Sequence, residues 1–127
     1  MFEINCKKNI LIVEDDLVLC LIIAKYLKKQ GYRIETTTNG IEALDYLQST
    51  NTLPDLILSD IMMPYMNGIE LLNKIKQDKK LENITVFAIT ALEEEMIPTK
   101  AENGFDQIIK KPFSLLELCN EIEKELQ

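Results

Sequence analysis

One stretch of the sequence decides the fold: residues 56–64, with the sequence LILSDIMMP. Its apolar run ends abruptly in a single carboxylate, Asp60, and a turn at Asn67-Gly68 follows shortly afterwards. Short, continuous apolar runs are typical of strands that are buried on both faces of a parallel sheet. The stretch therefore predicts a central strand that brings Asp60 to the edge of a sheet, at the start of a loop.

Four other segments show strand patterns. Residues 9–13 and 83–89 are largely apolar, which favours central positions, whereas residues 33–38 and 106–112 mix polar with apolar side chains, which favours the edges. Helical patterns separate the strands, so the chain alternates strand and helix. This alternation predicts an α/β fold: a doubly wound, five-stranded parallel sheet with helices on both faces. The flavodoxin-like strand order 2-1-3-4-5 satisfies the edge assignments.

The sequence predicts five helices, and their patterns differ in how regular they are. The first, residues 17–30, has a wide apolar face that predicts deep burial, and it ends at a glycine. The second begins at the N-cap Asn39 and is expected to bury Ile41, Leu44 and Leu47. The third covers residues 68–77. The fourth contains Pro98, which is costly inside a helix, so it is expected to be short or broken, and the fifth begins with a capping box at Ser114.

Composition bounds the kind of protein that this sequence encodes. Its 127 residues suit a single domain, with a core at residues 9–126 and no output domain. A net charge of −7 without His argues against direct nucleic-acid binding. Neither a membrane-spanning segment nor a signal peptide is recognisable. Cys6, Cys20 and Cys119 lack metal-type spacing, and two of them lie in apolar helical patterns, so we expect a cytoplasmic protein.

Ionisable and hydroxyl side chains stand at the carboxyl ends of the predicted strands. The first strand ends in Glu14 and Asp15, the third in Asp60, the fourth in Thr90 and the fifth in Lys111. Ligands of doubly wound sheets bind outside this edge. Two carboxylates ~4 Å apart repel by about 4 kcal/mol at an effective dielectric of 20, so three unpaired ones would be costly in a marginally stable domain. Lys111 offsets part of the charge, and Mg²⁺ suits the remainder because it prefers oxygen ligands.

Each of these residues also has a simpler explanation. The acids at 14–16 could merely cap the first helix, and Asp60 could be a loop acid paired with Lys111. Thr90 could be a strand-end hydroxyl, and Lys110 and Lys111 could belong to a solvated edge. The convergence of all of them at one edge of the sheet favours a functional site.

Several motifs stand out together: residues 10–16 (ILIVEDD), residues 55–64 (DLILSDIMMP), Gly68, Thr90-Ala91 and Lys111-Pro112. Over essentially the whole chain, this set resembles the receiver domain of response regulators in two-component signalling. The resemblance implies that Asp60 is a phosphoacceptor, which takes a phosphoryl group from a sensor histidine kinase or a phosphotransfer protein. It also implies a module that promotes its own phosphorylation and dephosphorylation and switches the binding of a downstream protein.

The resemblance further implies a metal site around the phosphoacceptor. Asp15 and Asp60 would bind Mg²⁺ directly, Glu14 would act through water, and the backbone carbonyl of Met62 would be a further ligand. Met62 and Leu92 are apolar at positions that influence the access of hydrolysing water in relatives. We therefore expect slow self-dephosphorylation.

On the phosphoryl side, the resemblance implies that Thr90 hydrogen-bonds a phosphoryl oxygen, that Lys111 pairs with it, and that the bond to Pro112 is cis. Two departures from the family pattern alter the expected switch. Relatives often carry an aromatic residue where this chain has Ile108, and the segment from Thr90 to Lys111 looks about one residue short and contains Pro98. We expect output to depend on movement of the fourth helix, or on a surface that differs from the common one.

Other functions on this fold fit less well. An aspartyl-phosphate phosphatase usually needs a second acid two residues after the nucleophile, where this chain has Met62. A flavin-binding protein needs a Gly/Ser/Thr-rich turn after the first strand, where this chain has acids. The alternatives that stay open are an interaction scaffold that takes no phosphate and a receiver excised from a hybrid kinase or multidomain regulator. The cognate kinase, the downstream partner and homodimer formation are also left open.

Overall fold

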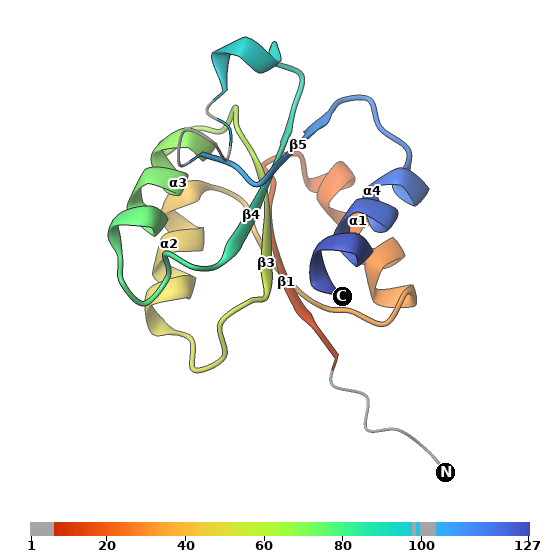
Figure 1. The fold of residues 1–127 in the computed structure, drawn as a ribbon, viewed down its shortest axis with the longest axis horizontal. Helices are drawn as coiled ribbons and strands as arrows, with labels where there is room; N and C mark the ends of the chain where they lie inside the picture. Colours follow the sequence, from red (N-terminus) through yellow and green to blue (C-terminus); the bar gives the residue numbers. More distant parts are fainter. Residues whose placement is uncertain (1–6, 98, 100–103) are drawn as a thin grey trace.

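A five-stranded parallel sheet lies between two pairs of helices (Figure 1). The computed structural model describes residues 7–97, 99 and 104–127. The strand order is β2-β1-β3-β4-β5, so the predicted order and the predicted edges are confirmed. The strands are β1 (Asn9–Val13), β2 (Arg33–Thr37), β3 (Leu56–Asp60), β4 (Thr85–Thr90) and β5 (Gln107–Lys110).

Helices cover both faces of the sheet, as predicted. The pair α1 (Leu17–Lys29) and α4 (Leu115–Leu126) lies on one face, and the pair α2 (Gly40–Ser49) and α3 (Gly68–Gln77) lies on the other (Figure 1). Side chains of β3 alternate between the two cores, because successive strand residues point to opposite faces. Ile57 packs on the α2/α3 side, whereas Leu56 and Leu58 pack on the α1/α4 side. None of the described helices is long and apolar enough to cross a bilayer.

Capping side chains fix where the helices begin. One carboxylate oxygen of Asp16 accepts hydrogen bonds from the backbone amides of Val18 and Leu19, both at 3.1 Å. For Asp16, the simpler explanation of a helix cap is therefore correct. Asn67 and Glu70 form a full capping box at the start of α3. Because α1 begins after Asp16, Glu14 and Asp15 stay in the loop between β1 and α1, at the edge of the sheet.

The prediction of deep burial for the first helix is wrong. Four side chains on one side of α1 are exposed: Leu17 by 67%, Val18 by 68%, Leu21 by 68% and Ile22 by 47%. The helix packs on the sheet through its other side, which consists of Cys20, Ile23, Ala24 and Leu27. A helix in the outer layer of such a fold buries only the stripe that faces the sheet. For the same reason Ile41, which was expected to be buried on α2, is 47% exposed.

The segment between β4 and β5 also differs from the expectation. The described part of this segment holds a 3₁₀ turn, Glu94–Met96, and no α-helix. Among the described residues, the fold therefore has four α-helices instead of five. The prediction for Pro98 lies outside the described residues.

Candidate functional site

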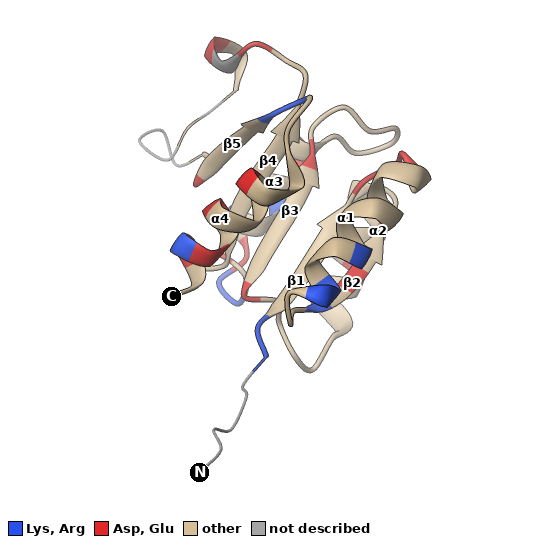
Figure 2. Cartoon of the chain, turned by 90° about the vertical axis from the view of Figure 1, so that its right-hand side faces the viewer, with Lys and Arg blue, Asp and Glu red and all other residues tan. Residues whose placement is uncertain are grey.

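The register of the sheet brings the ends of four strands to one edge. Val13 of β1 pairs with Ser59, Asp60 of β3 pairs with Ile89, and Thr90 of β4 pairs with Lys110 of β5. The residues that directly follow these pairs must therefore lie side by side. In Figure 2 the blue segment at the end of β5 lies at the same edge as red segments from the other strands. Basic and acidic groups thus converge where the sequence predicts a site.

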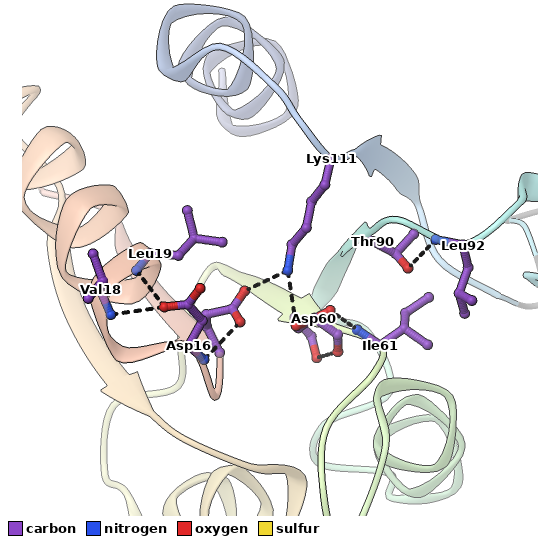
Figure 3. Close-up of polar contacts among 10 residues, drawn as sticks. Asp16, Val18, Leu19, Asp60, Ile61, Thr90, Leu92 and Lys111 are labelled. Atoms are coloured by element: carbon purple, nitrogen blue, oxygen red, sulfur yellow. Dashed lines mark hydrogen bonds and ion pairs between the residues drawn. The ribbon is translucent and has the colours of Figure 1, made fainter.

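Three carboxylates and one ammonium group meet at this edge. Glu14, Asp15 and Asp60 each offer a carboxylate oxygen, and these oxygens all lie within 4.8 Å of one another. The Nζ atom of Lys111 lies 3.2 Å from Oδ2 of Asp60 and 3.4 Å from Oε1 of Glu14. Figure 3 shows the lysine side chain extended toward Asp60. The predicted convergence of these four residues is confirmed.

Asp60 is buried and its carboxylate is held on both sides. Oδ1 accepts a hydrogen bond from the backbone amide of Ile61 at 2.7 Å, and Oδ2 accepts one from Lys111 (Figure 3). A backbone hydrogen bond holds the loop after Asp60, since the amide of Gly68 donates to the carbonyl of Ile61 at 2.8 Å. A Cβ atom at Gly68 would lie only 2.3 Å from the Asp60 carbonyl oxygen, so this close approach requires glycine. The site carboxylate is therefore positioned by backbone groups of its own loop.

Glu14 is the least satisfied group in the site. It is completely buried, and although Oε2 accepts a hydrogen bond from the Asp16 amide at 3.1 Å, Oε1 has no hydrogen-bond partner. The net pKa of Glu14 is raised to about 7: burial raises it most, the amide of Asp16 lowers it, the neighbouring Asp60 raises it, and Lys111 lowers it. A buried carboxylate with an ion pair but no hydrogen bond on one of its oxygens favours a proton or a further cation beside it.

Lys111 is the positive group of the site. Burial lowers the pKa of its ammonium group, but attraction by Asp60 and Glu14 outweighs burial, so the net shift is upward. The lysine therefore stays charged at neutral pH. The peptide bond from Lys111 to Pro112 is cis, as predicted.

Thr90 and Met62 have the predicted places in the chain, but their roles stay predictions. Thr90 ends β4 next to Asp60, is buried, and accepts a hydrogen bond on its hydroxyl oxygen from the amide of Leu92 at 3.0 Å (Figure 3). Met62 lies in the loop after Asp60, with an exposed side chain. No described contact shows what its backbone carbonyl binds.

The donor set fits a hard divalent cation. Carboxylate oxygens from Glu14, Asp15 and Asp60 are near enough to share one ion, and the buried Oε1 of Glu14, which has an ion pair with Lys111 but no hydrogen bond, gains a second cationic neighbour if an ion is present. Asp15 is exposed, so it can offer an oxygen while water completes the coordination. A site made of oxygen ligands with room for water suits Mg²⁺ better than a softer metal.

Sequence reasoning missed two features close to this site. The first is the exposed apolar side of α1, because an apolar pattern does not tell which side is covered. The second concerns Lys110, whose Nζ atom donates to the carbonyl of Leu92 at 2.8 Å. The alternation of side chains along β5 could have separated Lys110 from Lys111, since neighbouring strand residues point to opposite faces.

The family model of the response regulator receiver domain matches residues 10–123. Response regulator receiver protein CpdR of Brucella abortus is 40% identical over 122 residues, which cover 94% of this chain and 97% of CpdR. Probable transcriptional regulator ycf29 of Pyropia yezoensis is 40% identical over 116 residues, which cover 88% of this chain but only 50% of that protein. The chain thus spans about half the length of ycf29 and nearly all of CpdR.

A solved structure supports the same relationship. The response regulator TrrA of Thermotoga maritima, in complex with Mg²⁺ and BeF, has a TM-score of 0.79 and 30% identity. The match covers 93% of this chain and 98% of TrrA. With the family model matching most of the sequence and the sheet, strand order and acidic edge in place, this chain belongs to the response regulator receiver domain family of two-component signalling.

Proposed function

We propose that Asp60 of this receiver domain accepts a phosphoryl group, in a reaction that requires Mg²⁺, from a phosphohistidine of a sensor histidine kinase or phosphotransfer protein. The observation that supports this proposal is the convergence of three carboxylates with Lys111 around a buried aspartate. Phosphoryl transfer asks mainly for positioning and for neutralisation of negative charge. The geometry of the site supplies both.

The residues divide the work of the transfer. Asp60 is the nucleophile: one of its oxygens forms the bond to phosphorus while the bond from phosphorus to the histidine nitrogen breaks, and that nitrogen keeps the electron pair. Lys111, whose Nζ atom lies 3.2 Å from Asp60, pairs with a phosphoryl oxygen once the group has arrived. Thr90 donates its hydroxyl hydrogen to another phosphoryl oxygen.

The metal would be held by Asp15 and Asp60 directly, by Glu14 through water, and by the backbone carbonyl of Met62. When bound, Mg²⁺ offsets the negative charge of the carboxylates and of the incoming phosphoryl oxygens. The buried Glu14 keeps this charge balance in favour of a cation, because its Oε1 atom accepts no hydrogen bond and shares Lys111 with Asp60. Without a cation, the carboxylates of Glu14, Asp15 and Asp60 therefore repel one another, and a bound cation would relieve this repulsion.

The phosphodonor needs a surface on which to dock beside Asp60, and the exposed side of α1 offers one. This surface, which we call the α1 face, consists of Leu17, Val18, Leu21 and Ile22. It begins two residues after Asp15, and on the loop that follows Asp60 the side chain of Tyr65 is 83% exposed. Contiguous apolar surface of this kind marks an interaction site. We infer that a helical phosphodonor packs on the α1 face while its histidine reaches Asp60.

After transfer, we expect slow self-dephosphorylation, so that a lifetime of seconds for the phosphorylated form would contradict the expectation. Met62 and Leu92 present apolar side chains on the loops at either side of the site, and they hinder the approach of a water molecule to the phosphoryl group. We further propose that output depends on movement of the segment between β4 and β5, where the fourth helix was expected, or on a surface that differs from the common one, because Ile108 has no aromatic ring that could change its rotamer. A cytosolic location and a single receiver unit over residues 1–127 stay predictions.

One experiment tests the proposal directly. The protein is incubated with Mg²⁺ and a small phosphodonor, and its intact mass is measured alongside the Asp60→Asn variant. We expect the wild type to gain one phosphoryl group only when Mg²⁺ is present, and the variant to gain none. Wild type that gains no mass, or Asp60→Asn that gains as much as wild type, would contradict the proposal.

A further inference from the structure

Lys110 is the last residue of β5, and it contacts a different part of the molecule from Lys111, which follows it. Ile108, two residues earlier and on the same face, packs against the core between the sheet and the α2/α3 pair. Leu92, in the loop after β4, packs against that same core. The half-buried Lys110 reaches this loop with its ammonium group and donates to the Leu92 carbonyl at 2.8 Å.

Leu92 is therefore held on both sides. Its carbonyl accepts from Lys110, and its amide donates to the hydroxyl oxygen of Thr90 at 3.0 Å. Thr90 is itself paired with Lys110 in the β4–β5 ladder, and its carbonyl accepts from the Lys111 amide at 2.8 Å. These contacts connect Lys110 with the hydroxyl group of Thr90 through Leu92. Figure 3 shows the contact between Thr90 and Leu92.

We propose that Lys110 is a positioning residue for phosphorylation of Asp60, which acts by holding Leu92 and, through Leu92, the hydroxyl of Thr90. This inference rests on the proposed function. Two arrangements of the Thr90 side chain follow from the proposed function. In the first, which the structure shows, the hydroxyl oxygen accepts from the Leu92 amide. In the second, which we infer, the side chain turns away from that amide and donates to a phosphoryl group on Asp60. The contact from Lys110 stabilises the first arrangement, so it disfavours the phosphorylated form.

The direction of the effect follows from population shift. A contact that exists in only one of two arrangements stabilises that arrangement, and its loss moves the population toward the other. Removing the ammonium group of Lys110 frees the loop at Leu92 while leaving Asp60, Lys111 and the acids unchanged. Phosphorylation by a small phosphodonor, which docks on no protein surface, then becomes faster.

The test compares Lys110→Met, which keeps the length of the side chain but cannot donate, with Lys110→Arg, which can. Lys76→Met is a matched control, because Lys76 also donates to a backbone carbonyl, that of Glu82 at 3.4 Å, but at the end of α3. Initial rates of Mg²⁺-dependent mass gain are measured for all proteins. Solvent exchange of the Leu92 amide is measured by NMR in the unphosphorylated state.

We expect Lys110→Met to gain phosphate roughly three- to tenfold faster than wild type, as the loss of one partly solvated hydrogen bond predicts. Its Leu92 amide should exchange faster. Lys110→Arg and Lys76→Met should stay near the wild-type rate. If Lys110→Met does not fold, Lys110→Gln, which is too short to reach the carbonyl, replaces it.

An unchanged or lower phosphorylation rate in Lys110→Met overturns the inference, as does an unchanged exchange rate at the Leu92 amide. The proposed function fails separately, if wild type gains no phosphate at all. In that case the amide exchange still reports whether Lys110 holds Leu92, so the two failures are distinguishable.

Discussion

The buried carboxyl group of Glu14 should make the metal-free protein less stable as the pH rises. Its pKa is raised to about 7 in the folded protein from an ordinary value of 4.5, chiefly by burial. The folded state therefore binds this proton more tightly than the unfolded state does. Between pH 4.5 and 7 the unfolded chain has already lost the proton while the folded chain still holds it, so the free energy of unfolding falls with rising pH.

The size of the effect follows from the two pKa values. Integrating the proton linkage from about pH 5.5 to about pH 8 gives a loss of about 2 kcal/mol for this group. Other carboxyl groups add their own pH dependence, so the quantity to measure is the difference between wild type and Glu14→Gln. The variant keeps the shape of the side chain and its acceptor for the Asp16 amide, but it cannot titrate.

Urea denaturation at both pH values, in the presence of a chelator, measures this difference. We expect wild type to lose about 2 kcal/mol more than Glu14→Gln between the two pH values. Saturating Mg²⁺ should reduce the loss in wild type, because a cation favours the ionised carboxylate. If the two proteins show the same pH dependence within about 0.5 kcal/mol, the argument from burial of Glu14 is refuted.

Four further predictions follow from the site and its surroundings. Mg²⁺ should raise the melting temperature of wild type, and it should raise that of Asp60→Asn by less, as scanning calorimetry can check. In metal-free protein at high pH, Asp60→Asn should itself increase the free energy of unfolding by about 1 kcal/mol. The reason is that two carboxylates within 4.8 Å repel Asp60 more than one lysine attracts it. A variant that is less stable than wild type in urea denaturation would contradict this. Gly68→Ala should cost about 3 kcal/mol because its Cβ atom would meet the Asp60 carbonyl, whereas Gly31→Ala, with open space but a φ of +101°, should cost about 1 kcal/mol in the same assay. Leu21→Glu should slow phosphotransfer from a protein phosphodonor by about tenfold or more and leave the small-phosphodonor rate unchanged, whereas Ile41→Glu on α2 should change neither rate.

The predictable parts of this molecule are those that depend on short patterns and on the geometry of parallel sheets. The apolar run before Asp60 marks a buried strand, and parallel strands place their ends at a common edge, so Asp60, Glu14 and Lys111 could be brought together without coordinates. The acids at residues 14–16 were open to two explanations as a group, because an acid before a helix can serve a cap or a metal site. For Asp16, two bonds to α1 amides decide in favour of the cap.

The parts that could not be predicted depend on what covers a side chain. The first helix is apolar on several sides, and its sequence does not reveal that Leu21 faces away from the sheet while Ile23 faces toward it. The loop after β4 has no repeating pattern, so the turn at Glu94–Met96 and the contact from Lys110 to Leu92 emerge only from tertiary structure. Such contacts join residues that are distant in sequence, and no local rule specifies them.

The α1 face should also affect self-association of the protein in solution. Adjoining aliphatic side chains open to water attract their counterparts on another molecule, while a net charge of −7 keeps the molecules apart. Salt screens this repulsion but leaves the aliphatic attraction in place. Light scattering should therefore detect self-association as ionic strength rises, and a polar residue at Leu21 should suppress it.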